Sequence, residues 1–336
     1  MKNHINIFSA TCTRELAQRV VNKINENIRE NEKYPNDTEL VELGNCKIEY
    51  FKDREVTCDF QSSIRRKPVY IFGNTGTDNV VELLIMLDAA KRAAPSEIHI
   101  ILPYYGYGRQ DKKEGKNKRG PIGAKLMADM LSVAAGHKLE GIIVIDLHAD
   151  AIEGFFDVPV NHISGMTIFK HKIQNMIKDN PSNYIIASPD AGGKQRATRI
   201  AKKMGLELVG MDKTRVKPGE VADISMAGEV EGKKILLIDD MVASAGTLIK
   251  AADYLIEQKK ADSVFAFCTH PVLVDGAVEK INNAKNLTGI IVSDSNHLNE
   301  ESLNCSKIEV VSTADILAKI IGNVLTVGSS LNEINS

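Results

Sequence analysis

The 336-residue chain lacks the features that mark several large classes of protein. Its five cysteines are scattered and form no Cys-x-x-Cys pair, so we expect neither a metal cluster nor a disulfide framework, and a reducing compartment fits. No apolar run is long enough for a membrane-spanning helix, and the amino-terminal residues lack the apolar core of a signal peptide. We therefore expect a cytoplasmic protein that does not enter a membrane.

The chain also lacks a strong charge of either sign. Its 42 basic and 44 acidic residues nearly cancel, and no basic run carries interleaved aromatic residues, so a nucleic-acid partner is not indicated. A Walker A loop is missing too. The nearest candidate, residues 228–234, has too few residues between its glycines and no Ser or Thr after its lysine. Any ATP must therefore be bound by another kind of loop.

What is present is the length and pattern of a two-domain α/β protein. The composition, 43% hydrophobic and 26% charged, is that of a globular chain. Short apolar runs alternate with stretches of helical periodicity in both halves, which predicts parallel sheets flanked by helices. We predict two similar tandem domains, residues 1–162 and 163–336.

The predicted elements follow this alternation. We expect strands at residues 5–8, 47–51, 55–60, 69–72, 97–102, 141–145, 184–187, 207–211, 235–238, 264–269, 288–293 and 308–311. We expect helices at residues 14–28, 78–94, 121–135, 165–177, 194–204, 248–257, 276–283 and 314–324. The glycine-rich residues 103–121 and the polar residues 212–222 are expected to be loops.

The most informative stretch is residues 235–247. Four apolar residues without alternation predict a strand buried on both faces, and Asp239 and Asp240 follow at its carboxyl end, where open α/β sheets bind ligands. The small residues 243–247 then allow backbone amides to approach an anion at the start of a helix. Carboxylates accept hydrogen bonds from hydroxyls, or bind a hydrated metal ion. A ligand with a phosphate at one end and a diol at the other is a sugar phosphate.

This stretch resembles the ribose-5-phosphate loop of the phosphoribosyltransferase fold. Together with the motifs below, the chain resembles the ribose-phosphate pyrophosphokinase family over nearly its whole length. The resemblance implies two phosphoribosyltransferase-like domains and transfer of the β,γ-pyrophosphoryl group of Mg-ATP to the 1-hydroxyl of ribose 5-phosphate, giving phosphoribosyl pyrophosphate and AMP for nucleotide biosynthesis. It also implies Mg²⁺ as cofactor and a homo-oligomer, which in the family is a hexamer. The implied ribose-5-phosphate residues are Arg215, Asp239, Asp240, Ala243, Ser244, Ala245, Gly246 and Thr247.

Two segments resemble the family's ATP-binding segments. Residues 51–55, Phe-Lys-Asp-Arg-Glu, resemble Phe-Ser-Asp-Gly-Glu, whose aromatic ring lies against adenine. Residues 104–111, Tyr-Tyr-Gly-Tyr-Gly-Arg-Gln-Asp, resemble Pro-Tyr-Phe-Gly-Tyr-Ala-Arg-Gln-Asp. An aromatic ring offers a stacking face, and an arginine can fork onto phosphate oxygens. The implied ATP-binding residues are Phe51, Asp53, Arg54, Glu55, Arg109, Gln110 and Asp111.

Two further motifs imply the metal and catalytic residues. Residues 146–150, Asp-Leu-His-Ala-Asp, are similar to the family's Asp-Leu-His-Ala-Glu, whose histidine contacts magnesium, and a comparable loop contains Asp190. Together they favour a divided Mg²⁺ site of His148 and Asp190, with the imidazole contact direct or through water. Lys213 and Arg215 lie in a segment that resembles the family's catalytic flexible loop, where they would close over developing phosphate charge. No general base is evident.

The chain departs from the family pattern at several positions. Ala243 stands where the family has aspartate, Ser244 and Ala245 replace Thr-Gly, and Arg54 replaces glycine. The loop at residues 73–77 is shorter than the family's pyrophosphate loop. Residues 112–120 lack most arginines of its regulatory loop.

Two other functions stay open because of these departures. One is a catalytically weak or regulatory paralogue, which Ala243 supports. The retained His148, Asp190, Lys213 and Arg215 oppose it. The other is a phosphoribosyltransferase, which would use the same sugar-phosphate loop without an ATP site. The two-domain length and Arg109 oppose that second alternative.

Overall fold

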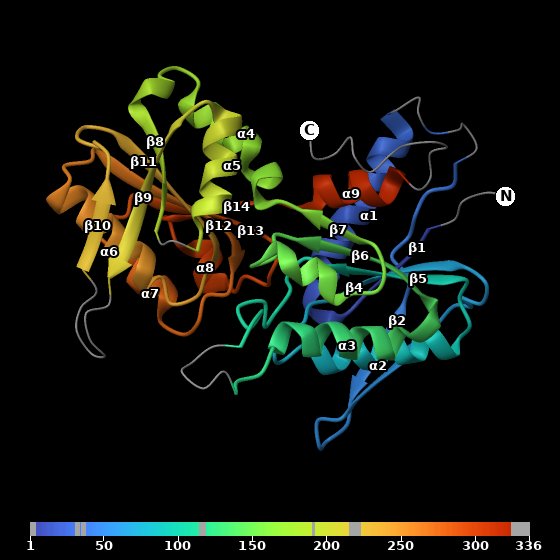
Figure 1. Cartoon of the computed structure of the whole chain (residues 1–336). Coiled ribbons are helices and arrows are strands. Elements are labelled where there is room, and N and C mark those ends of the chain that lie inside the picture. The colour runs from blue at the N-terminus through green and yellow to red at the C-terminus, as the bar shows by residue number, and fades with distance from the viewer. Residues whose placement is uncertain are drawn as a thin grey trace. The chain divides into compact units, whose positions relative to one another are not determined.

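The computed structural model describes residues 5–30, 34, 38–113, 119–189, 192–214 and 223–323, with only the backbone described at 212–214, 223–225 and 227. Its contacts divide the chain into two compact units, Met1–Ser164 with Thr313–Ser336, and Gly165–Ser312. Each unit is an α/β fold (Figure 1). Among the helices of the described residues, none combines the length and the apolar character needed to cross a bilayer.

The first unit is built on a five-stranded parallel sheet in the order β1-β4-β5-β6-β7. These strands are β1 (Asn6–Ser9), β4 (Pro68–Phe72), β5 (Glu97–Leu102), β6 (Leu139–Ile145) and β7 (Val160–Ile163). Helices α2 (Val80–Arg92) and α3 (Gly123–Ala135) cover one face, and α1 (Arg14–Glu30) and α9 (Ala314–Gly322) cover the other (Figure 1). Because both faces are covered, the central strands are continuous apolar runs.

A separate antiparallel hairpin, β2 (Cys46–Tyr50) and β3 (Val56–Phe60), packs against α2. The hydroxyl of Tyr50 donates a hydrogen bond to the carboxylate of Glu82 on α2. This hydrogen bond, followed by burial, raises the pKa of Tyr50 to about 12, so the phenol stays protonated and remains a donor. The hairpin's turn extends beyond α2 and α3 (Figure 1).

The second unit is built on a seven-stranded sheet in the order β10-β9-β8-β11-β12-β13-β14, in which only β9 and β10 pair antiparallel. The strands are β8 (Tyr184–Ser188), β9 (Glu207–Thr214), β10 (Asp223–Ala227), β11 (Lys234–Val242), β12 (Ser263–Pro271), β13 (Gly289–Ser293) and β14 (Ile308–Val311). Helices α4 (Gly165–Ile177) and α5 (Lys194–Met204) lie on one face, and α6 (Gly246–Asp253) and α7 (Ala277–Asn283) on the other (Figure 1). A short α8 (Glu300–Asn304) precedes β14.

The predicted α/β fold with two similar parallel-sheet domains is confirmed. The sequence analysis did not predict β7, β10 or α8, and three of its other predictions are corrected. Residues 212–214, predicted as loop, are the end of β9 because they pair with residues 223–225 of β10. β11 runs to Val242 rather than ending at Ile238, because β12 continues to pair alongside it, so the two aspartates lie within the strand.

The third correction concerns the C-terminal helix. We predicted that residues 163–336 form one domain, but Thr313 and α9 belong to the first unit. The apolar side of α9, which includes Leu317 and Ile321, is buried, and the helix packs against α1. The chain thus returns to its first sheet after completing the second.

Candidate active site

The loop after β11 ends in an open helix start. Ala245 is the N-cap residue of α6, and no side chain caps the first-turn amides there. The carbonyl of Ala243 accepts a hydrogen bond from the Val274 amide at 3.1 Å, and that of Val242 accepts one from Leu273 at 3.0 Å. The loop is therefore fixed through its carbonyl groups, while the amides and partial positive charge of the helix start suit an anion such as phosphate.

The two aspartates of β11 have different surroundings. Oδ1 of Asp239 accepts the backbone N–H of Asp240 at 2.9 Å. Asp240 is buried, and its Oδ1 lies 3.9 Å from Nη1 of Arg196 on α5, with side-chain exposures of 5% and 15%. Because this pair is little exposed, solvent screens it less than a surface pair, and the guanidinium offsets the repulsion between adjacent carboxylates.

Sequence reasoning missed Arg196. In the sequence, Arg196 is a basic residue in the first turn of the helix that follows Gly192-Gly193. Its link to the aspartates can be recognised only once β8 and β11 are known to be neighbours. Since α5 begins beside β11, its first turn reaches the acidic pair.

Three loops of the first unit meet at the carboxyl edge of its sheet. Oγ1 of Thr75 donates to the carbonyl of Gly106 at 3.3 Å, and the hydroxyls of Thr77 and Tyr107 are 3.0 Å apart. A Cβ built on Gly108 would lie 3.3 Å from Cβ of His148. Residues 73–77, 103–113 and 146–150 therefore form one surface at the edge where parallel sheets bind ligands.

Arg109, Gln110 and Asp111 lie in the middle loop of this group. Arg109 and Gln110 are exposed, and Asp111 is partly buried. The backbone there is fixed to α3, because the carbonyl of Gln110 accepts the Ala124 amide at 3.2 Å. Tyr105 donates its hydroxyl to the Ala124 carbonyl at 2.7 Å, and burial raises the pKa of Tyr105, which keeps this donor neutral. The exposed side chains thus stand on a fixed backbone.

The other predicted ATP segment forms the turn of the β2–β3 hairpin. Phe51 is 58% exposed, and Arg54 has φ 74° and donates its amide to the Phe51 carbonyl at 2.9 Å. The carboxylate of Asp53 accepts the Glu55 amide at 3.2 Å. The turn extends past α2 and α3 (Figure 1). By contrast, Arg109 precedes Gln110, whose carbonyl accepts the Ala124 amide at the start of α3. The structure therefore presents the two segments at separate places on the first unit.

The remaining predicted residues are only partly described. His148 is exposed at the edge formed by the three loops. Lys213 has a described backbone within β9, opposite Ile224 of β10. Asp190 and Arg215 lie outside the described residues. The pairing of His148 with Asp190, and the catalytic role of Lys213 and Arg215, therefore stay predictions.

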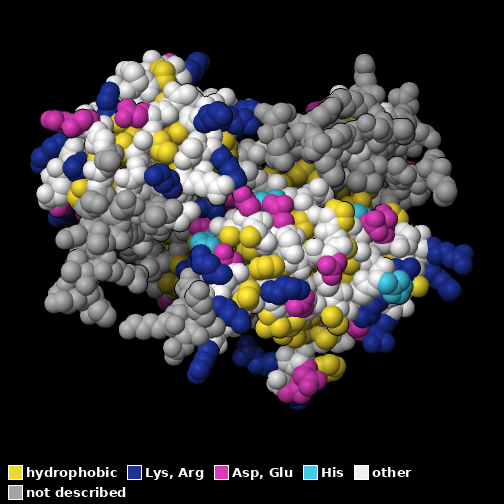
Figure 2. Space-filling view, viewed as in Figure 1, with side chains coloured by type: hydrophobic (Ala, Val, Ile, Leu, Met, Phe, Trp, Pro, Cys, Tyr) yellow, Lys and Arg dark blue, Asp and Glu magenta, His cyan; other side chains and the backbone are white. Residues whose placement is uncertain are grey.

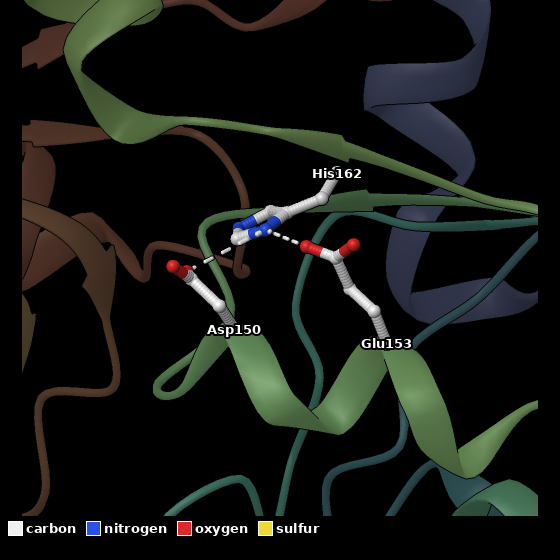
Figure 3. Close-up of side chains that lie close together, drawn as sticks. All are labelled: Asp150, Glu153 and His162. Atoms are coloured by element: carbon white, nitrogen blue, oxygen red, sulfur yellow. Dashed lines mark hydrogen bonds and ion pairs between the residues drawn. The ribbon is translucent and has the colours of Figure 1, made fainter.

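Three side chains that could donate to a metal lie close together (Figure 3). They are Asp150, Glu153 and His162, which follow His148 in the sequence. Nδ1 of His162 is 2.7 Å from Oε1 of Glu153 and 4.0 Å from Oδ1 of Asp150. However, Nε2 accepts the Leu147 amide at 2.9 Å, so a neutral ring must carry its proton on Nδ1. A protonated nitrogen cannot bind a metal, so the group as it stands is a hydrogen-bonded carboxylate–imidazole pair.

Two family models match the chain. One for the N-terminal domain of ribose phosphate pyrophosphokinase matches residues 5–136, and one for the phosphoribosyl transferase domain matches residues 162–298. The first match covers strands of the five-stranded sheet, and the second covers most strands of the seven-stranded sheet. The fold and the loop after β11 thus define a protein with two domains of the phosphoribosyltransferase class.

Individual relatives match over nearly the full length. The chain is 38% identical to a ribose-phosphate pyrophosphokinase from Porphyromonas gingivalis over 96% of this chain and 95% of that one. It is 41% identical to one from Wolinella succinogenes over 84% and 89%. The crystal structure of phosphoribosylpyrophosphate synthetase from Mycobacterium smegmatis matches with a TM-score of 0.82 and 29% identity, over 96% and 98%. The chain belongs to the ribose-phosphate pyrophosphokinase family of enzymes.

The contact between the first two loops predicts a stability effect. A Cβ at Gly106 would lie 2.5 Å from the Thr75 carbonyl oxygen and 2.9 Å from the Gly76 nitrogen, so Gly106→Ala must displace backbone. We expect it to lower the free energy of unfolding by about 1–3 kcal/mol, seen as a lower urea midpoint. Gly154→Ala is the matched control, because a Cβ there meets nothing within 4 Å. Equal midpoints for the two variants would contradict the close packing of these loops.

Proposed function

We propose that this enzyme transfers the β,γ-pyrophosphoryl group of Mg-ATP to the 1-hydroxyl of ribose 5-phosphate, forming phosphoribosyl pyrophosphate and AMP. The observation that carries the proposal is the β11–α6 loop, in which an acidic pair precedes a helix start that no side chain caps. Asp239 and Asp240 would accept hydrogen bonds from the ribose hydroxyls, and residues 244–247 would hold the 5-phosphate. Ala243 and Ala245 would contribute backbone groups only.

ATP is assigned to the first unit. Arg109 would fork onto phosphate oxygens, with Gln110 and Asp111 beside it, because all three stand on the edge that Gly106 and Gly108 help to form. Phe51 would stack on adenine, and the turn residues Asp53, Arg54 and Glu55 would supply polar contacts to the base and ribose. The separation of the two segments supports the idea that the turn serves a neighbouring copy of the chain.

Mg²⁺ would be held by His148 and Asp190. One imidazole and one carboxylate leave most coordination positions for water and phosphate oxygens, which is how Mg²⁺ is usually bound. The exposed position of His148 at the loop edge fits such an arrangement. The ion would neutralise phosphate charge, and Lys213 and Arg215 would add to this at the transferring group. In such a reaction the protein mainly positions its substrates.

A direct assay tests the reaction. Incubation of the purified protein with MgCl₂, ATP and ribose 5-phosphate is expected to give AMP and phosphoribosyl pyrophosphate in equal amounts, detected by chromatography. A regulatory paralogue would bind the ligands without forming AMP. A phosphoribosyltransferase would consume phosphoribosyl pyrophosphate with a nucleobase and would not require ATP. Absence of AMP would therefore refute the proposal.

Lys213 provides a second test. Lys213→Ala removes a cation from developing phosphate charge, so we expect kcat to fall by roughly 100-fold or more with a small change in KM for ribose 5-phosphate. Steady-state kinetics at saturating Mg-ATP measure both. Lys202→Ala, on the exposed side of α5, is the control and should retain the kcat of the parent protein. If kcat of the Lys213 variant is unchanged, the residue takes no part in the chemistry.

We also propose that the protein forms a homo-oligomer, as the resemblance implies. Hydrophobic side chains gather on the surface over α2 and α3 (Figure 2). Val81 on α2 is 57% exposed, and Leu126 and Val133 on α3 are 54% and 74% exposed. An exposed apolar patch of this kind favours a protein partner, and a second copy of the chain is the simplest one. The cytoplasmic location remains a prediction.

Sedimentation velocity tests this surface. Val133→Glu places a charge in the apolar face and is expected to shift the protein to smaller species by weakening association at least tenfold. Leu303→Glu, at a 59% exposed position on α8, is the matched control and should leave the distribution unchanged. An identical distribution for both variants would exclude the α2–α3 face from assembly.

A further inference from the structure

The turn that carries His148 begins with a strained residue. Asp146 is buried and has φ 42°, in the left-handed region that non-glycine residues rarely occupy. Its amide donates to the carbonyl of Ile163 at 2.7 Å, and the next amide, of Leu147, donates to Nε2 of His162 at 2.9 Å. Such strain persists only where surrounding contacts hold it. Here His162 and Ile163 of β7 accept hydrogen bonds from two consecutive amides of the turn.

The second of these contacts requires one particular form of histidine. Only a ring nitrogen without a proton can accept the Leu147 amide, so Nε2 must be bare and Nδ1 must carry the proton. Glu153 accepts that proton's hydrogen bond at 2.7 Å and so selects this tautomer (Figure 3). The His162 side chain is only 13% exposed, so water competes little at the ring itself, although Glu153 is 41% exposed.

Three contacts then fix the chain at Leu147 and His148. The side chain of Leu147 is 2% exposed within the first unit's core, and its amide is held by His162. Gly108 of the neighbouring loop approaches Cβ of His148. The hydrogen bond to His162 is directional, so it helps to orient the Asp146–Leu147 peptide, one residue before His148.

We propose that His162 is a positioning residue that acts through His148: its imidazole, held by Glu153 in the Nδ1–H tautomer, orients the turn so that His148 faces the Mg-ATP phosphates. This rests on the proposed function, in which His148 contacts Mg²⁺. Histidines that bind a metal usually donate their other ring N–H to a carboxylate or carbonyl in this way. In this protein the free nitrogen instead accepts a backbone amide one residue before the candidate ligand.

The tautomer is tested on the metal-free protein without any activity measurement. In ¹⁵N-histidine-labelled protein, two-bond ¹⁵N–¹H correlation spectra assigned with His162→Gln should show His162 with a protonated Nδ1 and a bare Nε2. The Leu147 amide should exchange slowly with solvent and lose that protection in His162→Phe. A protonated Nε2, or a rapidly exchanging Leu147 amide in the parent protein, would overturn the proposal.

The functional consequence is tested with two substitutions at one position. His162→Phe removes the acceptor, and we expect it to raise the Mg²⁺ concentration for half-maximal AMP formation at least tenfold, within the range seen for residues that orient metal ligands. His162→Gln can still offer an amide oxygen to Leu147 and should stay within about threefold of the parent protein. In a His148→Ala background, His162→Phe should have no further effect, because His162 acts through that residue.

The outcomes separate this inference from the proposed function. If the parent protein forms no AMP, the proposed function fails, while the tautomer and amide exchange still decide the hydrogen bond. If His162→Phe lowers the unfolding temperature without changing the Mg²⁺ requirement, the residue is merely structural and the positioning role is wrong. If His162→Phe does not fold, Glu153→Ala replaces it, because releasing the tautomer should raise the Mg²⁺ requirement severalfold; an unchanged requirement would also overturn the role.

Discussion

The pairing of β11 with β12 is the constraint on which the sugar-phosphate loop depends. Parallel pairing continues past Ile238 at Asp239, Met241 and Val242, so both aspartates lie within the strand instead of in a free turn. This fixes the distance from the acidic pair to the start of α6, and a ligand with two polar ends needs such a fixed distance. It also buries Asp240, and a buried carboxylate is costly without a cation nearby. Arg196 therefore helps to stabilise the carboxylate that the extended strand buries.

Two departures from the family pattern are explained by backbone conformation. Arg54 and Ala245 both stand where the family has glycine, and both have positive φ, 74° and 59°. The chain thus keeps the glycine-like backbone of each turn without glycine, at a cost of roughly 1–2 kcal/mol for each residue. A strained conformation at a non-glycine residue persists only where surrounding contacts hold it, so the structure around each turn fixes its shape. The departure at Ala243 differs, because it removes a carboxylate and leaves the local backbone hydrogen bond to Val274 in place.

Local signals predicted most of the fold, and contacts between distant segments account for what was missed. The bounds predicted for β5, α4, α5 and β14 are those observed, because each has a clear apolar pattern between polar or glycine-containing ends. β10 and the end of β9 were missed because they have no local apolar pattern. They are strands because they pair antiparallel with each other. Arg196 and His162 were missed for a similar reason. Their partners, Asp240 and Leu147, lie far from them in the sequence and come close only in the folded chain. Motif resemblance supplied the candidate ligands, but it could not show that Phe51 and Arg109 stand at separate places.

The two units position their candidate functional residues in a similar way, near the end of a strand. In each, a motif residue lies close to the carboxyl end of a buried parallel strand, and a polar side chain from a neighbouring element holds the backbone or the charge beside it. Arg196 does this for Asp240, and His162 does it for the amide before His148. These supporting residues need not touch a ligand, and a search for motifs passes over them. Because a hydrogen bond to a strained turn is directional, a change at such a position can alter how a ligand is held while the fold and the motif itself stay intact.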